Sequence, residues 1–345
     1  MSNRLILPRN IIVCIGDGMG AEKVKAAGMY AHGTAGTLSF EAFPYRSTMT
    51  THSADSLITD SAAASTAMAT GFKVNNGVIS MALPGDGTQL YTLLECFRDR
   101  GKSTGLVSTT FITHATPAGF GAHNPERGNL SEIAESYLSD SRPNVLLGGG
   151  GNGMSVTAAE SAGYSVVTSR GDMLSPGIEK IAQLSGQFGD TNLPYEYDGL
   201  GDLPHLSEMT AVALNILEKG PNGFFLMIEG GRIDHAGHSN DIERNVCETI
   251  EFSRTLGVVS NWAKGLEDTL IIVTADHETG GLQVLENTGK GNFPSVSWST
   301  DGHTTASVPV YAWGCGAERI CGVRDNTDLF GVVANAQVNS ALKHS

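Results

Sequence analysis

Short runs of apolar residues alternate along the chain with longer stretches that have the periodicity of amphipathic helices. The runs are β-branched or aromatic and are flanked by glycine or polar residues, which is typical of buried strands. We expect strands at Ile11–Ile15, Thr104–Ser108, Val145–Leu147, Phe224–Ile228, Leu270–Val273 and Ser307–Trp313. Helices are predicted from about Ala21 and over Ser61–Thr70, Thr88–Arg100, Leu130–Ser139, Leu206–Glu218 and Arg244–Ala263. The alternation predicts an α/β fold, a three-layer sandwich whose mostly parallel central sheet carries helices on both faces.

The length of 345 residues suits one large domain that carries an insert. Residues 148–204 are rich in Gly, Ser, Asp and Pro and have weak periodicity, so we expect an accessory insert there within a single domain over 1–345. The GGGGNG sequence in this stretch lacks the Lys-Ser/Thr of a P-loop and the spacing of a dinucleotide fingerprint. A turn is therefore favoured over a phosphate cradle.

The charge balance excludes some classes of partner. With 36 acidic and 22 basic residues the net charge is −14, which argues against nucleic acid or an anionic membrane as partner. An anionic substrate would be repelled at long range, so a phosphate would need bound metals or an arginine clamp. No stretch approaches the length of a membrane span. The five cysteines are scattered, and free thiols are favoured over a Cys315–Cys321 bridge.

Carboxylates and histidines follow three of the predicted strands directly. Asp17, Glu229, Asp276 and His277 all stand at the carboxyl end of an apolar run. Ligands of open parallel sheets gather at that edge, so these side chains are expected to lie together. Asp276 and His277 are adjacent and would face opposite ways in a strand, so the strand must end before them if both are ligands.

The spacing of further residues suggests metal sites. Asp234 and His238 share one face of a helix, and with His303 they would form the open three-ligand set of a catalytic zinc. Asp276, His277 and Asp17 would form a second set, and Asp17 could also reach an all-oxygen site with Glu229. Two metals about 4 Å apart favour in-line displacement at phosphorus.

A serine and an arginine complete the candidate chemistry. Ser61 opens an Ala-rich helix behind Asp60, which is expected to cap it, and a helix N-terminus favours negative charge. Taken alone, Asp-Ser before an alanine run is an ordinary cap. Thr116 offers a hydroxyl oxygen to a hard cation, and Arg127 is a candidate phosphate clamp. His114 and His235 are expected to face the substrate or to support the metal ligands.

These motifs occur together, and in the same order, in the alkaline phosphatases, which the chain resembles over nearly its whole length. The sequences that carry the resemblance are GDGMG, TDSAAASTAMATG, THATPA, EGGRIDHAGH, TADHETGG and GHTTASVPVYAWG. The resemblance implies a phosphate-monoester hydrolase of broad substrate range in which Ser61 becomes phosphorylated. It further implies zinc on Asp234, His238 and His303, a second zinc on Asp17, Asp276 and His277, magnesium on Asp17, Thr116 and Glu229, and Arg127 on the phosphate.

The chain departs from the enterobacterial members of that family at two positions and in length. His114 and His235 stand where those enzymes have Asp and Lys, and the loop at about 282–302, which builds a crown in many relatives, is short. By its length the chain resembles the compact bacterial type related to cold-adapted marine enzymes. The same pair of histidines occurs in the animal enzymes, whereas the marine relatives tend to have Trp at the second position. The resemblance implies a homodimer and a periplasmic or secreted location, with no signal peptide in the sequence as given.

Two other classes of function are open at this point. A phosphodiesterase or sulfatase could use the same scaffold, although TDSAAA lacks the C/S-x-P-x-R context that a sulfatase needs. A non-enzymatic metal- or phosphate-binding protein could keep the fold, but such relatives usually lose the nucleophile or a ligand, and none is missing here.

Because His114 and His235 replace the acid and the lysine, the third metal site is expected to bind magnesium loosely. The rate of phosphate-ester hydrolysis should then rise when magnesium is added to protein that was dialysed against a chelator and reloaded with zinc alone. Equal initial rates with and without magnesium would contradict this expectation.

Overall fold

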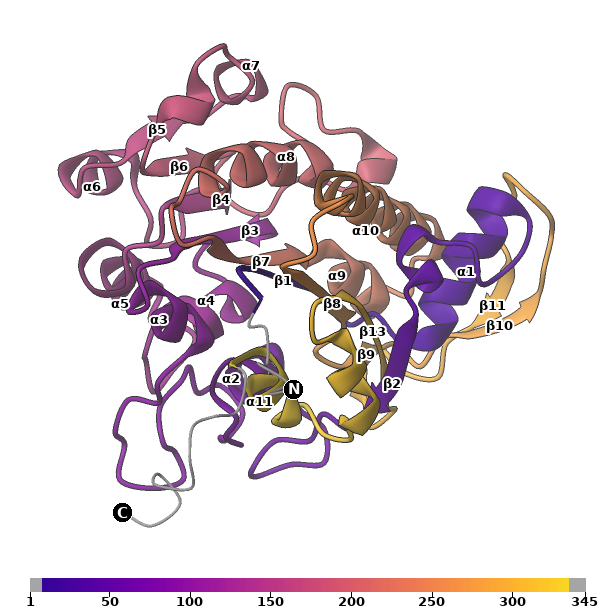
Figure 1. Cartoon of the computed structure of the whole chain (residues 1–345). Helices are drawn as coiled ribbons and strands as arrows, with labels where there is room; N and C mark the ends of the chain where they lie inside the picture. Colours follow the sequence, from indigo (N-terminus) through magenta and orange to yellow (C-terminus); the bar gives the residue numbers. More distant parts are fainter. Residues whose placement is uncertain (1–7, 335–345) are drawn as a thin grey trace, which may run out of the picture.

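The computed structural model describes residues 8–334, and its centre is a nine-stranded sheet with helices on both faces (Figure 1). In order across the sheet the strands are β2 (Tyr45–Met49), β13 (Val308–Gly314), β8 (Thr269–Thr274), β1 (Asn10–Gly16), β7 (Phe224–Gly230), β3 (Ser103–Phe111), β4 (Val145–Gly149), β6 (Leu184–Gln187) and β5 (Ser165–Val167). Within this nine-stranded sheet only the two pairings of β13, with β8 and with β2, are antiparallel. The predicted mostly parallel sheet is confirmed.

Two groups of helices form the outer layers (Figure 1). One face carries α1 (Ala21–His32), α8 (Leu206–Leu217), α9 (Arg232–His238) and α10 (Ile242–Ala263), which pack on one another. The other carries α2 (Ser61–Thr70), α3 (Leu93–Arg98), α4 (Ala115–Gly121), α5 (Leu130–Ser136) and α11 (Asp328–Ala334). The three-layer arrangement expected from the sequence is therefore present.

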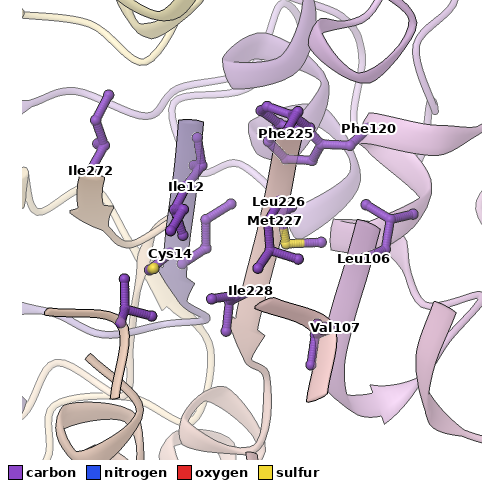
Figure 2. Close-up of a cluster of buried hydrophobic side chains, with 14 of the residues drawn as sticks. Ile12, Cys14, Leu106, Val107, Phe120, Phe225, Leu226, Met227, Ile228 and Ile272 are labelled. Atoms are coloured by element: carbon purple, nitrogen blue, oxygen red, sulfur yellow. The ribbon is translucent and has the colours of Figure 1, made fainter. Parts of the chain in front are cut away.

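The central strands are buried along their whole length because helices cover both of their faces. Every residue of β1, β7 and β8 is buried, which explains why these strands are continuous apolar runs rather than alternating ones. Aromatic rings fill the layer between the sheet and α3 and α4: Phe225 of β7 stacks on Phe97 at 5.4 Å and on Phe120 at 6.0 Å between ring centroids. Figure 2 shows Phe225 and Phe120 beside the aliphatic residues of the sheet.

The register of the sheet places the carboxyl ends of four strands side by side. Ile15 of β1 pairs with Glu229 of β7 and with Thr274 of β8, and Ser108 of β3 also pairs with Glu229. The residues that follow these positions therefore emerge at one edge. β8 ends at Thr274, so Asp276 and His277 lie beyond the strand as the sequence required.

Two local predictions were wrong. The polar stretch before Ser61 contains an unpredicted strand, β2, which lies at the edge of the sheet and is half exposed, so its sequence carries no apolar run. The helix expected over Thr88–Arg100 begins only at Leu93. Thr92 caps it, since its hydroxyl accepts a hydrogen bond from Glu95 N while the Glu95 carboxylate accepts one from Thr92 N.

Two stretches singled out in the sequence are ordered into small elements. Residues 148–204, expected as an accessory insert, include α6 (Val156–Ser161) and α7 (Arg170–Met173), and they add β6 and β5 to one edge of the main sheet. In the 282–302 loop β10 (Gln283–Glu286) and β11 (Ser295–Ser297) form a hairpin. Beside it β9 (Glu278–Thr279) pairs with β12 (His303–Thr304). Within the described residues no disulfide joins any two of the five cysteines, as favoured from the sequence.

The aromatic stack predicts a large effect of truncating its central ring. Phe225 has no exposed surface, so Phe225→Ala is expected to lower the free energy of unfolding by about 3–5 kcal/mol through lost burial and the cavity left behind. Leu57→Ala is the control, because that side chain is 77% exposed and its loss should change stability by less than about 0.5 kcal/mol. Denaturant titration measures both; equal midpoints would contradict the role of the stack.

Candidate active site

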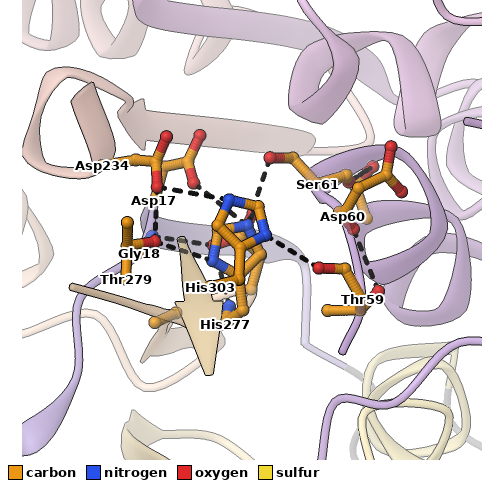
Figure 3. A network of polar contacts seen from close by, with 12 residues as sticks. Asp17, Gly18, Thr59, Asp60, Ser61, Asp234, His277, Thr279 and His303 are labelled. Atoms are coloured by element: carbon orange, nitrogen blue, oxygen red, sulfur yellow. Dashed lines mark hydrogen bonds and ion pairs between the residues drawn. The ribbon is translucent and has the colours of Figure 1, made fainter. Parts of the chain in front are cut away.

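Four carboxylates meet in the interior at the carboxyl edge of the sheet. Asp17 follows β1, Glu229 lies near the end of β7 and Asp276 follows β8, and none of the three has exposed surface. Asp234, in the first turn of α9, is 5% exposed and lies close to Asp17 (Figure 3). Burial, followed by repulsion from Asp276 and Asp234, raises the pKa of Asp17 well above its usual value. Carboxylates buried this closely need a cation as partner.

The two residue sets expected to hold zinc each come together. The ligand atoms of Asp234, His238 and His303 lie within 4.8 Å of one another. Those of Asp17, Asp276 and His277 satisfy the same limit and are fully buried. In the second set His277 Nε2 lies 3.1 Å from Asp276 Oδ2 and 3.5 Å from Asp17 Oδ1.

Each histidine of these sets has Nδ1 engaged by a protein group, so Nε2 faces the cluster. The carbonyl oxygens of Asp301 and Thr59 lie 2.5 Å from His238 Nδ1 and 2.8 Å from His303 Nδ1. His277 Nδ1 lies 3.2 Å from the Thr279 hydroxyl. A carbonyl only accepts, so Nδ1 of His238 and of His303 donates, and in its neutral form each ring presents a lone pair at Nε2.

Those lone pairs form a pocket of acceptors. The Nε2 atoms of His238 and His303 are 3.1 Å apart, and each lies within 3.6 Å of an Asp234 carboxylate oxygen. Acceptors in this arrangement fit a cation between them. Hydrogen bonds that orient the far nitrogen of each ring are also what metal-binding histidines usually have.

A third group surrounds Asp17 on its other side. It includes Asp17, Glu229 and His114, and the sequence resemblance implied that Thr116 also lies beside the two carboxylates. Thr116 lies there too, and its Oγ1 is buried without a hydrogen-bond partner. Burial raises the pKa of Glu229 to about 7, and the hydrogen bond from the Ser108 hydroxyl partly offsets that effect.

Unpaired buried atoms test whether these residues fit metal ions. Within residues 8–334, both carboxylate oxygens of Asp17 and one each of Glu229 and Asp276 are buried without a hydrogen-bond partner, as are Thr116 Oγ1 and His114 Nδ1. Buried polar atoms are nearly always paired, so this concentration of oxygen acceptors fits divalent cations.

Ser61 lies at the start of α2 with its hydroxyl at the second cluster. Its Oγ is 3.3 Å from His277 Nε2, and only 3% of the residue is exposed (Figure 3). Asp60 caps the helix as predicted, since Oδ1 accepts a hydrogen bond from Ala63 N at 2.9 Å. The other carboxylate oxygen, Oδ2, accepts from Arg127 Nη1 at 3.0 Å. One carboxylate thus fixes both the serine helix and the candidate phosphate clamp.

The two histidines that depart from the enterobacterial pattern lie side by side between two arginines. The rings of His114 and His235 are perpendicular with centroids 5.8 Å apart. Arg127 Nη2 is 3.3 Å from His114 Nε2, and Arg232 Nη1 is 2.7 Å from His235 Nδ1. Burial lowers the pKa of His114 well below its usual value and that of His235 to about 4, so neither ring carries a charge near neutral pH.

Sequence reasoning missed several residues that support the carboxylates. The Thr279 hydroxyl donates to Asp234 Oδ1 at 2.5 Å, and the hydroxyls of Ser108 and Thr110 donate to Glu229 Oε2. Ser108 and Thr110 stand at the carboxyl end of β3, so the rule that located Asp17 could have located them as well.

Lys23 of α1 is a further omission. It has no exposed surface, and Nζ donates to the Gly18 carbonyl at 2.7 Å. Burial lowers its pKa, and the charges of Glu278, Asp234, Asp17 and Asp276 oppose that shift. Its position in an ordinary amphipathic helix gave no signal, because lysines of such helices usually reach solvent.

Comparisons with known proteins agree with this geometry. The family model "Alkaline phosphatase" matches residues 8–295. The chain is 34% identical to alkaline phosphatase 3 of Bacillus subtilis over 408 aligned positions, which cover 93% of this chain and 87% of that protein. It is 33% identical to streptomycin-6-phosphate phosphatase of Streptomyces griseus, with 95% and 90% covered.

Solved structures give the same result. The alkaline phosphatase of the Antarctic bacterium TAB5 superposes with a TM-score of 0.85 at 30% identity, over 96% of this chain and 98% of that one. A variant of that enzyme, with a TM-score of 0.86, carries Mg in its M3 site. The cold-active enzyme of a Shewanella species also has a TM-score of 0.85, at 28% identity over 94% and 99% of the two chains.

The fold and the site thus define a metal-dependent phosphomonoesterase. The chain belongs to the alkaline phosphatase family, which confirms the resemblance found in the motifs. Among residues 8–334 no helix combines the length and the apolar character that crossing a bilayer requires.

Lys23 is predicted to offset the repulsion among the buried carboxylates when metal is removed. Lys23→Met is expected to lower the free energy of unfolding of chelator-treated protein by about 3–5 kcal/mol, because buried negative charge then loses its partner. The control is Lys25→Met on the same helix, whose surface ion pair with Glu22 at 3.0 Å should contribute less than about 1 kcal/mol. Denaturant titration measures the stability of both variants, and equal midpoints would contradict the prediction.

Proposed function

We propose that the chain hydrolyses phosphate monoesters of broad range through a phosphoserine on Ser61. The observation that carries the proposal is the position of Ser61 Oγ, 3.3 Å from His277 Nε2 and at the N-terminus of α2. Ser61 Oγ would attack phosphorus, the ester oxygen would leave, and water would then hydrolyse the phosphoserine.

We propose that three metal ions occupy the site. Zinc would be held by Asp234, His238 and His303 and by Asp17, Asp276 and His277, and magnesium by Asp17, Thr116 and Glu229. When bound, such ions supply positive charge to the phosphoryl oxygens and lower the pKa of a nucleophile. The unpaired oxygens of Asp17, Glu229 and Asp276 support this assignment.

Arg127 and the start of α2 would bind the phosphoryl group. Arg127 donates one hydrogen from Nη1 to Asp60 and one from Nη2 toward His114, and each of these nitrogens has a second hydrogen for a phosphate oxygen. The free backbone N–H groups at the helix start favour the same negative charge. All of these groups address phosphate rather than the leaving group, which supports a broad substrate range.

Further properties are proposed from membership of the family. We propose a homodimer located in the periplasm or outside the cell, acting on small phosphate monoesters. The net charge of −14 supports the expectation that nucleic acid and anionic membranes are not partners.

Removal of the Ser61 hydroxyl tests the phosphoserine. Hydrolysis of p-nitrophenyl phosphate at pH 9 is measured for wild type and Ser61→Ala after dialysis against a chelator and again after zinc and magnesium are restored. We expect wild-type activity to depend on metal and Ser61→Ala to lose on the order of a thousandfold or more in kcat.

Ser65→Ala is the matched control, since Ser65 lies one turn later in α2 and its hydroxyl bonds backbone carbonyls such as that of Ser61 at 2.6 Å. It should retain activity within about threefold. Metal-dependent activity that survives in Ser61→Ala would show that water attacks phosphorus directly. Faster cleavage of bis(p-nitrophenyl) phosphate than of the monoester would favour the diesterase alternative.

A further inference from the structure

We propose that Arg232 is a positioning residue that fixes the tautomer of His235, so that a neutral His235 presents Nε2–H to the phosphoryl group. Arg232 belongs to none of the residue sets described above as metal or phosphate ligands. The inference rests on the proposed phosphatase site, and it adds a hydrogen-bond donor to that site whose direction is set by a neighbouring side chain.

The contact between the two side chains determines where the proton lies. Arg232 Nη1 is 2.7 Å from His235 Nδ1. A guanidinium has only donors, so Nδ1 must accept and carries no hydrogen. A doubly protonated ring would set one N–H against another at this distance. The ring is therefore neutral with its hydrogen on Nε2, and the assignment follows from the chemistry of arginine.

Arg232 is held in place by contacts that do not involve His235. Its guanidinium carbon lies 3.7 Å from the centroid of the Tyr195 ring, a cation–π contact. The backbone N–H groups of Gly231 and Arg232 donate to Thr109 Oγ1 at 3.0 and 3.3 Å, which fixes the start of α9. These contacts hold Arg232 in place independently of its contact with the imidazole of His235.

The other nitrogen of His235 is directed away from Arg232. Within the described residues no protein group accepts a hydrogen bond from Nε2, and the ring lies against His114, which itself contacts Arg127. The Nε2–H group is therefore available to donate to a phosphate held by Arg127, without adding a full charge.

His114 receives the opposite assignment from its own arginine. Arg127 Nη2 donates to His114 Nε2 at 3.3 Å, so the hydrogen of His114 lies on Nδ1, which is 4.0 Å from Glu229 Oε1. Two neutral imidazoles are thus oriented in different directions by two arginines. His114 is directed toward the carboxylates and His235 toward the phosphoryl group.

Nitrogen NMR of protein labelled with ¹⁵N-histidine tests the tautomer directly. The signal of His235 is assigned by its absence in His235→Ala. We expect the wild type to show protonated Nε2 and unprotonated Nδ1, Arg232→Met to show a mixture of tautomers, and Arg232→Lys, which keeps a donor, to restore the wild-type pattern. A wild-type His235 with its hydrogen on Nδ1 overturns the proposal.

Inhibition of the zinc- and magnesium-loaded enzyme by inorganic phosphate tests the consequence. Arg232→Met is expected to weaken phosphate binding about tenfold, the effect of losing one hydrogen bond to a charged group, and Arg232→Lys to restore it within about threefold. In the His235→Ala background Arg232→Met should have no further effect. An undiminished effect there would show that Arg232 acts through its own charge and overturns the proposal.

The two readouts separate this inference from the proposed function. If the wild type hydrolyses no phosphate monoester, the proposed function fails while the NMR pattern still decides the tautomer. Unfolding midpoints of all variants, compared with wild type, identify any loss of binding that comes from partial unfolding.

Discussion

Electrostatic repulsion among buried carboxylates is the constraint on which the rest of the site depends. Asp17, Glu229 and Asp276 are brought together by the register of β1, β7 and β8, which the core holds fixed from both faces of the sheet, and Asp234 joins them from α9. The groups around them compensate part of the charge: the Gly18 N–H donates to Asp276, hydroxyls donate to Glu229 and Asp234, and Lys23 places an ammonium behind them. The carboxylate oxygens that remain without a hydrogen-bond partner fit divalent cations.

A second theme is that charged groups act here through shared partners. Asp60 caps the serine helix with one oxygen and holds Arg127 with the other, so the nucleophile and the phosphate clamp cannot move independently. Arg127 in turn contacts His114. A substitution at any one of these three residues therefore disturbs the other two, and single-site effects are not expected to add.

The sequence predicted the parts of the molecule that depend on local pattern. The apolar runs at Ile11–Ile15, Phe224–Ile228 and Leu270–Val273 identified the central strands, and the rule that ligands gather at their carboxyl ends located the carboxylates. The strand β2 was not predictable, because an edge strand that pairs on one side needs no apolar run. Lys23 and Arg232 were missed because the burial of Lys23 among distant carboxylates and the stacking of Arg232 on Tyr195 depend on packing between elements distant in sequence.

The bond from His238 Nδ1 to the carbonyl of Asp301, and the pairing of β12 with β9, anchor the chain on the far side of the β10–β11 hairpin. The hairpin tip between them contributes none of the candidate ligands. Its length can therefore change during evolution without moving His238 or His303. The alignment with alkaline phosphatase 3 of Bacillus subtilis spans 408 positions against a chain of 345 residues, so that relative has additional residues within the aligned region. A hairpin tip of this kind lets a family acquire new surfaces for assembly or specificity while the chemistry of the active site stays constant.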